Sequence, residues 1–358
     1  MSGYKANQQS SARPVNSIPI TDGKPQESVC ELQYNTNRQL LGASTWDCKL
    51  TFWKIEDNYS KFQKKNVYNI EKLRNVILRF AFHEKNDSVY CGLSDGSVRK
   101  IPNINTAEEP VEFKSNGQPL KHNGIITGLI IKDDLLITSS ANLDLILTDL
   151  NSGEKITDVP LSDKPTSLCL SNDQNYVYCA QNTDGITSFD LRNPKINLKA
   201  WETKEILSFP TTQIAPCGEN GFIVSTIFGL CCCADSYTSP AVPIECFRDY
   251  GTPKMIFPAN SVTTIYSPPN HNYAIMGGGN GCINITNLND KSKQRECQIG
   301  SSRSRGPLSV TRVCALGNQD PFVAVATGYD WQKGVEPQKG IVFDYNIFIH
   351  NFGSEIPK

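Results

Sequence analysis

Cysteines are the first residues in this sequence whose number could indicate chemistry, since 13 of the 358 residues are Cys. Three of them are consecutive, at positions 231–233, but the chain has no Cys-x-x-Cys pair. Side chains alternate between the two faces of a strand, so three neighbouring thiols cannot reach one metal ion together. The pattern therefore predicts cysteines that fill a core as small apolar side chains, and no metal or other cofactor.

Histidines and nucleophile motifs give no better case for catalysis. The four histidines, His83, His122, His271 and His350, fall in four separate segments. Walker A and His-Glu-x-x-His patterns are absent from the sequence, and its Gly-x-Ser-x-Gly match, residues 92–96 (GLSDG), ends in the Asp-Gly pair of a predicted hairpin turn. The glycine-rich residues 277–281 lack the Gly-Lys-Ser/Thr ending of a phosphate-binding loop, and we predict a hairpin turn there. We therefore predict that the chain is not an enzyme.

The charge balance and the hydropathy pattern argue against two further classes of protein. The 35 basic and 36 acidic side chains leave a formal net charge of −1, whereas binding to duplex nucleic acid requires clustered Lys and Arg. The most apolar stretch, residues 222–234, is shorter than the roughly 20 residues of a membrane helix. The N-terminus has no apolar core of a secretory signal. We expect a soluble, intracellular protein without membrane insertion, in which the Ser- and Arg-rich residues 301–305 leave a contact with RNA open.

Short apolar runs, separated by Gly, Asn, Asp and Pro, must position whatever site the chain has. They are rich in β-branched and aromatic residues and show no long helical period, which favours strands. A polar turn recurs at a spacing of about 40–50 residues, which is the period of four-stranded propeller blades. We take as turn positions Asp47, Asp95, Leu143, Asp184, Gly229, Asn280 and Asp330. These seven turns predict an all-β fold, a single seven-bladed β-propeller.

The domain boundary is predicted from a change in composition. Residues 1–26 are rich in Ser, Asn, Gln and Pro and contain few apolar residues, which is typical of a disordered segment. The alternating strand patterns begin after this stretch. We therefore predict a disordered N-terminal tail over residues 1–26 and one propeller over residues 27–358, and we expect a monomer.

Three stretches carry a resemblance to a known family. Residues 44–47 (STWD), residues 244–248 (IECFR) and residues 326–334 (ATGYDWQKG) are similar to segments of one group of WD-repeat propellers. This group comprises the nuclear-pore mRNA export factor (Gle-two/Rae-one type) and its mitotic spindle-checkpoint paralogue (Bub-three type). The third stretch looks like the last blade of the export factor, so the resemblance favours that branch.

The resemblance implies a scaffold that binds an acidic peptide hairpin of an FG nucleoporin or of checkpoint kinases. The matching partner-binding positions are Trp46, Asp47, Arg248, Lys291 and Lys293, whereas Asp330 and Trp331 match structural positions of the last blade. Residues 227–233 lack the Glu and Arg that the family carries in its fifth blade, which implies weaker or shifted peptide binding. The implied location is the nucleus and the pore complex of the nuclear envelope, with a cytoplasmic pool.

Several alternatives stay open on the sequence alone. A role in the spindle checkpoint, at kinetochores, is the main one, followed by a generic WD-repeat scaffold. A phosphoinositide-binding propeller is a further alternative, because Phe247-Arg248 is similar to part of a lipid-binding motif, but Asp249 would repel phosphate. Trp46 could instead pack between blades, and Lys291 and Lys293 could belong to a solvated loop.

Overall fold

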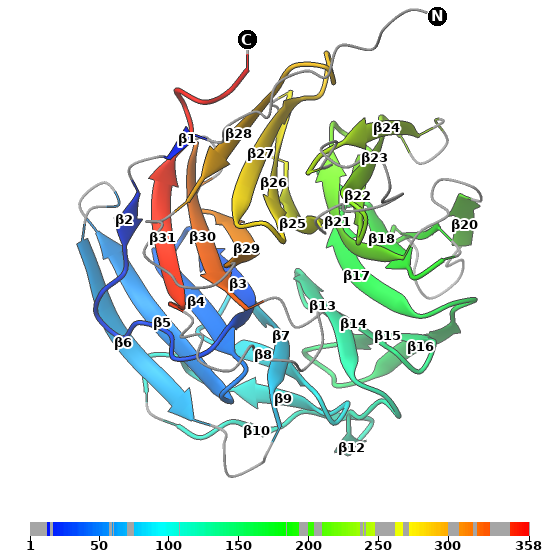
Figure 1. The fold of residues 1–358 in the computed structure, drawn as a ribbon. Helices are drawn as coiled ribbons and strands as arrows, with labels where there is room; N and C mark the ends of the chain where they lie inside the picture. Colours follow the sequence, from blue (N-terminus) through cyan, green and yellow to red (C-terminus); the bar gives the residue numbers. More distant parts are fainter. Residues whose placement is uncertain are drawn as a thin grey trace, which may run out of the picture.

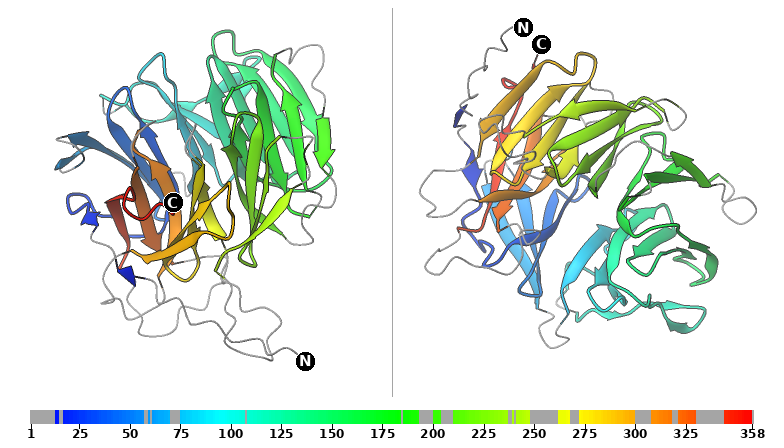
Figure 2. Two further views of the ribbon diagram at one scale, coloured as in Figure 1. Left: turned by 90° about the horizontal axis from the view of Figure 1, so that it is seen from above. Right: turned by 45° about the vertical axis from the view of Figure 1, so that its right-hand side comes forward.

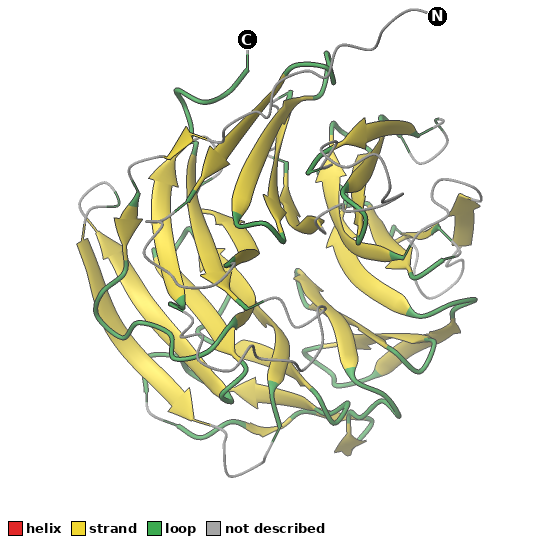
Figure 3. Ribbon diagram, viewed as in Figure 1, coloured by secondary structure: helices red, strands yellow, loops and turns green. Residues whose placement is uncertain are grey.

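The computed structural model contains only β-strands and loops in its described part (Figure 3). The described residues are 13–14, 17–56, 59, 61–69, 75–106, 108–183, 185–192, 200–203, 210–236, 239, 241–247, 262–267, 272–299, 308–317, 321–329 and 344–357. Arg248, Asp330, Trp331 and residues 301–305 lie outside this set, so the predictions made for them have no structural test. No helix in the described part is long and apolar enough to span a membrane.

Seven sheets stand around a central axis, each built on four antiparallel strands from the axis outward, and the sixth sheet carries a fifth, parallel strand at its outer edge (Figures 1 and 2). The first three are β3–β6 (Val29–Asn35, Leu40–Thr45, Lys49–Glu56, Lys61–Asn69), β7–β10 (Ile77–Phe82, Val89–Leu93, Val98–Ile101, Val111–Glu112) and β13–β16 (Ile126–Lys132, Leu135–Ser140, Asp144–Asp149, Lys155–Pro160). A small hairpin, β11 (Lys114–Ser115) and β12 (Gln118–Pro119), lies between the second and third sheets in the sequence.

The remaining sheets repeat the same order. They are β17–β20 (Pro165–Leu170, Tyr176–Gln181, Ile186–Asp190, Ala200–Thr203), β21–β24 (Thr211–Cys217, Gly221–Thr226, Leu230–Ala234, Val242–Glu245) and β25–β28 (Val262–Tyr266, Tyr273–Gly278, Cys282–Asn287, Gln294–Gln298), followed by β29–β31 (Ser309–Ala315, Phe322–Gly328, Asn346–Asn351). Each innermost strand contacts that of the next sheet, and β29 contacts β3. The ring is therefore closed, and the predicted all-β propeller of seven blades is confirmed.

The N-terminal segment supplies the outermost strand of the seventh blade. In Figure 1, β2 (Ile18–Pro19) lies beside β31, and the two pair antiparallel, with Ile18 opposite Ile349. The backbone N–H of Ile20 donates to the carbonyl of Ile347 at 2.9 Å, and the Ile20 side chain is 0% exposed. A second short strand, β1 (Arg13–Pro14), pairs parallel with β28.

This arrangement differs from the prediction of a disordered tail over residues 1–26. Residues 17–26 belong to the propeller because ladder hydrogen bonds and the burial of Ile20 hold them against the last blade. Composition could not indicate this, since the pairing partner lies at the other end of the chain. Residues 1–12 are outside the described part.

The core consists of apolar clusters between neighbouring blades. Phe52 of the first blade and Phe80 of the second meet edge to face, with ring centroids 6.3 Å apart. Between the fifth and sixth blades the cluster contains cysteines, and all cysteines except Cys48 and Cys314 are buried. Burial raises the pKa of the Cys232 thiol to about 11, so this thiol stays protonated at neutral pH. The prediction that the cysteines fill the core is thus confirmed.

The turns between the second and third strands recur once per blade and so mark the repeat period. In six blades one residue of this turn has a positive φ; these residues are Cys48, Gly96, Leu143, Gly185, Gly229 and Gly281. Glycine is required at two of them because a Cβ on Gly96 would lie 2.4 Å from the carbonyl oxygen of His122, and one on Gly281 would lie 2.4 Å from that of Leu308. Cys48 and Leu143 show that other side chains also occupy this conformation.

Candidate partner-binding faces

The alternation of strands gives the propeller two distinct faces. Every innermost strand begins at one face, which we call the upper face, and the turns between second and third strands lie there too. The turns between first and second strands, and between third and fourth strands, lie on the opposite, lower face. Thr36, Glu84, Asn172 and Ser267, from first-to-second turns of four blades, line one shared cavity at that lower face.

The structure separates the predicted partner-binding residues between these two faces. Trp46 and Asp47 lie in the turn between β4 and β5, on the upper face. Lys291 and Lys293 lie in the turn between β27 and β28, on the lower face. One peptide lying across the upper face therefore cannot contact both pairs. Spacing along the sequence does not reveal this, because the number of strands between two turns decides the face.

The two lower-face lysines make local contacts. The ammonium of Lys291 donates to the carbonyl of Leu288 at 3.0 Å. Lys293 lies 3.7 Å from the carboxylate of Asp290, and both side chains are about half exposed. Such exposed pairs contribute little to stability. These contacts fit the alternative of a solvated loop.

Trp46 and Asp47 have different environments although they are neighbours in one turn. Trp46 is 40% exposed, and its backbone N–H donates to the carbonyl of Ser28 at 3.1 Å. Asp47 accepts a hydrogen bond from the Thr45 hydroxyl and lies 2.5 Å from the ammonium of Lys49. Asp47 therefore holds the turn in shape, and Trp46 presents apolar surface on the upper face.

Two further apolar side chains are exposed on the upper face. Ile125, which precedes β13, is 45% exposed, and Leu143, in the turn between β14 and β15, is 38% exposed. The backbone N–H of Ala141 donates to the carbonyl of Ile125 at 3.0 Å, which ties the two segments together. The sequence pattern predicts Leu143 only as a turn position, without a contact. A leucine at a turn position is the sequence signal for this exposed apolar side chain.

Lysines gather in a groove between the N-terminal segment and the first blade, which Thr45 and Asp47, the chain neighbours of Trp46, also line. This groove has a volume of about 290 Å³, and its charged lining residues are Lys24, Lys49, Lys64 and Asp47. Lys24 pairs with Asp344 and Lys49 with Asp47, whereas Lys64 has no ion pair with any residue that the structure describes. The groove carries a positive excess, and it was not predicted because residues 17–26 were assigned to a tail.

A buried histidine, His122, bonds to two residues beneath the upper face of the third blade. His122 Nδ1 lies 2.7 Å from Asp144 Oδ1, and its Nε2 lies 2.8 Å from the hydroxyl of Thr138. The ring joins the segment that enters the third blade to the turn that presents Leu143. Sequence reasoning treated His122 as isolated, because its two partners follow it at spacings that match no catalytic motif.

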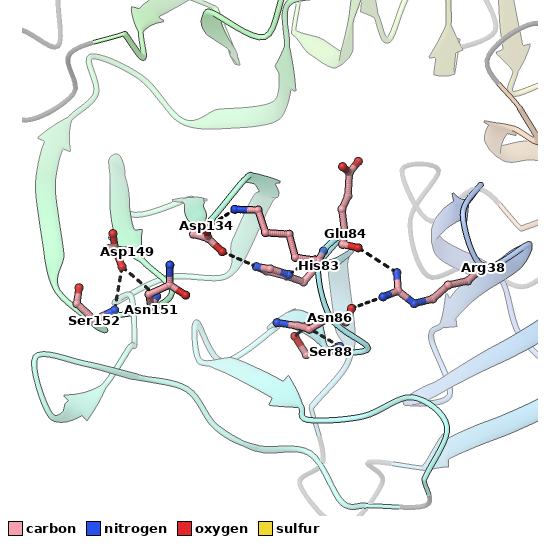
Figure 4. Close-up of polar contacts among 10 residues, drawn as sticks. Arg38, His83, Glu84, Asn86, Ser88, Asp134, Asp149, Asn151 and Ser152 are labelled. Carbon is pink, nitrogen blue, oxygen red and sulfur yellow. Dashed lines mark hydrogen bonds and ion pairs between the residues drawn. The ribbon is translucent and has the colours of Figure 1, made fainter.

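The lower face is joined across the first three blades by a polar network, defined here as Arg38, His83, Lys85, Asp87 and Asp134. Figure 4 labels three of these residues, Arg38, His83 and Asp134. Arg38 Nε donates to Asp87 Oδ1 at 2.7 Å, and Arg38 Nη2 donates to the carbonyl of Asn86 at 2.6 Å. Asp134 accepts from Lys85 and lies 3.2 Å from His83 Nε2. The hydrogen bond from Lys85 holds the pKa of Asp134 below its usual value. Each charge of this network thus has a partner inside the chain.

Metal chemistry finds no support in this geometry. Within the described part of the chain, no three His, Cys, Asp or Glu side chains are placed so that they could hold a metal ion. The histidines described above contact carboxylates that serve to join neighbouring blades or turns.

Comparisons with known proteins agree with this architecture. No protein-family model matches the chain. The chain is 23% identical over 365 residues to Protein RAE1 of Arabidopsis thaliana, covering 98% of this chain and 95% of that protein. It is 21% identical over 330 residues to Protein Rae1 of Drosophila melanogaster, covering 87% and 88% of the two chains.

Solved structures add the fold. The structure of U3-55K and the crystal structure of the RRP9 WD40 repeats each match with a TM-score of 0.74 at 11% and 12% identity, covering 95% of this chain and 99% of the other. The chain therefore shares the seven-bladed propeller fold of these WD40-repeat structures. It is similar along nearly its whole length to the Rae1 proteins of two organisms, and the resemblance to this family of propellers is thereby confirmed.

Proposed function

We propose that the chain is a scaffold of mRNA export that binds an acidic peptide segment of an FG nucleoporin at the nuclear pore, with nuclear and cytoplasmic pools. The observation that supports this most is the similarity to Rae1 proteins across 98% of the chain, together with Trp46 exposed in the first-blade turn. Both relatives carry the Rae1 name, so the export branch is favoured over the checkpoint branch.

The upper face around Trp46 suits such a segment. An indole that is partly exposed supplies apolar contact area, and Lys64 of the adjacent groove supplies charge for a Glu or Asp side chain. Ion pairs in a half-enclosed groove fix the register of an extended or hairpin peptide. Arg248 keeps its proposed role as a further carboxylate partner. Lys291 and Lys293 do not belong to this surface, because they lie on the lower face.

A direct binding measurement tests this proposal. The probe is a synthetic acidic hairpin peptide from an FG nucleoporin of the same organism, labelled for fluorescence anisotropy. We expect Trp46→Ala to weaken its binding about tenfold, the effect of losing one anchoring aromatic side chain. Lys64→Glu should weaken binding as well, and both effects should leave the melting temperature nearly unchanged because the two side chains are exposed.

The matched control is Lys293→Glu, which makes the same charge change on the lower face. Its peptide affinity should equal that of the wild type. Full affinity in the Trp46→Ala variant, or an equal loss in the Lys293→Glu variant, would show that the peptide does not use the upper face. Capture of partners from interphase and mitotic extracts separates the two branches, since a nucleoporin supports export and checkpoint kinases support the paralogue.

A further inference from the structure

The central channel opens at the lower face into a cavity of about 800 Å³. Residues from the innermost strands of all seven blades line it. Most of its described lining is apolar or neutral and polar. The side chains in it that carry a charge at neutral pH are Glu31, Arg79, Glu84 and Arg312. Glu84 lies in a turn at the rim and is exposed, whereas the other three come from the strands β3, β7 and β29.

These three strand residues form a group with more positive than negative charge, which we call the channel triad. Glu31 Oε2 lies 3.5 Å from Arg79 Nε and 3.8 Å from Arg312 Nε, so a single carboxylate faces two guanidinium groups. The side chains are 13–21% exposed. In such a partly desolvated site one surplus positive charge is only weakly screened.

The hydrogen bonding of Arg312 is also incomplete. Arg79 Nη1 donates to the carbonyl of Leu78 and Arg312 Nη1 to that of Thr311, both within their own strands. Arg312 Nε is buried and has no hydrogen-bond acceptor among the residues that the structure describes. Burial and the proximity of Arg312 lower the pKa of Arg79 to about 10, which keeps it charged at neutral pH. A buried donor without an acceptor is unfavourable, and an anion would supply the acceptor.

We propose that the channel triad binds a small phosphate-type oxyanion between Arg79 and Arg312, entering from the lower face. Guanidinium groups present forked donors that match the oxygens of phosphate. The surplus of one positive charge favours a small anion over a highly charged one. The neutral polar side chains of Ser167 and Gln213 line the same cavity. The volume of the cavity leaves room for the organic part of a phosphate monoester. The ligand is therefore free phosphate or a phosphate ester, because both present the same phosphate oxygens.

The experiment uses the full chain and inorganic phosphate as the probe, added against chloride at matched ionic strength. We expect the melting temperature of the wild type to rise with phosphate and to saturate, as binding to the native state requires. Glu31→Gln removes the competing carboxylate and should tighten phosphate binding at least about tenfold. Arg312→Gln removes one of the two guanidinium groups and should abolish the rise of the melting temperature with phosphate.

These opposite signs separate a binding site from a structural ion pair. If the channel triad served only to join blades, both variants would lose stability and neither would change its response to phosphate. That result would overturn the proposal. If Arg312→Gln does not fold, Arg312→Lys replaces it in the experiment. This variant keeps the positive charge but lacks the paired N–H donors of the guanidinium group, so its affinity for phosphate should fall. Titration with glycerol phosphate then distinguishes the source: tighter binding than phosphate assigns an ester, and equal or weaker binding assigns the free ion.

Discussion

The lower-face network and the channel triad both join neighbouring blades through arginine and carboxylate, yet they differ in completeness. In the network, Arg38 has Asp87 at 2.7 Å and a carbonyl at 2.6 Å, so its donors are used by the chain itself. In the triad, two arginines share Glu31 at distances of 3.5 and 3.8 Å. A completed set of contacts indicates a structural role. In the triad, the buried donor Arg312 Nε has no acceptor among the described residues, and the proposed anion site rests on this difference.

Solvent exposure makes the energetic difference larger. Asp87 is 42% exposed, so water and salt screen its attraction to Arg38. Glu31 is 13% exposed and is the shared counter-charge of two partly desolvated guanidinium groups. Removing a carboxylate should therefore have very different consequences in the two places.

The largest effect is expected for Glu31→Ala. This variant leaves Arg79 and Arg312 facing each other without a counter-charge, and loss of one member of a buried charge group costs about 3 kcal/mol. Urea unfolding in chloride buffer measures the free energy of unfolding. Glu84→Ala, which removes an exposed carboxylate at the rim of the same cavity, is the control and should change stability by less than about 0.5 kcal/mol. Equal effects of the two variants would contradict the distinction.

A smaller effect is expected for Asp87→Ala in the lower-face network. The Arg38–Asp87 pair is partly exposed, so its loss should lower the free energy of unfolding by about 0.5 kcal/mol. Raising the salt concentration to about 1 M should shrink the difference from the wild type, since the screening length falls to roughly 3 Å. A loss as large as that of Glu31→Ala, insensitive to salt, would mean that the two regions are energetically alike.

The fold could be predicted from the sequence because its determinants are local. Turns such as Ser94-Asp95-Gly96 and the alternating strands beside them repeat seven times, and each repeat carries its own signal. The outermost strand of the seventh blade could not be predicted in this way. It is formed by Ile18 and Pro19, which pair with β31, and a two-residue strand in a polar segment gives no pattern of its own.

The candidate sites were predictable only where one residue carries the signal. Trp46 is an aromatic residue within a turn, and the structure places it partly exposed on the upper face. Lys291 and Lys293 were grouped with it by resemblance, although the strand order places them on the lower face. Arg79 and Arg312 belong to blades that are far apart in the sequence. Only the closed ring brings them to the same carboxylate.

The smallest effect is expected for Asp134→Asn, and it tests whether the lower-face network stabilises the fold electrostatically. The hydrogen bond from Lys85 lowers the pKa of Asp134, so the native state binds a proton there less readily than the unfolded chain does. Its contribution is therefore fully present above the unfolded pKa and is lost as the pH falls through the lower native value. We expect Asp134→Asn to be slightly less stable than the wild type at pH 7.

This difference between Asp134→Asn and the wild type should disappear well below pH 4, where the carboxyl is protonated in both states. Thermal unfolding across the acid range measures it. Asp158→Asn is the control, because Asp158 forms an exposed pair with Lys155 at 3.2 Å and contacts no other blade through it. A difference that persists in acid would mean that the Asp134 side chain acts through packing. The contacts to Lys85 and His83 would then not be the electrostatic link between the second and third blades that their geometry indicates.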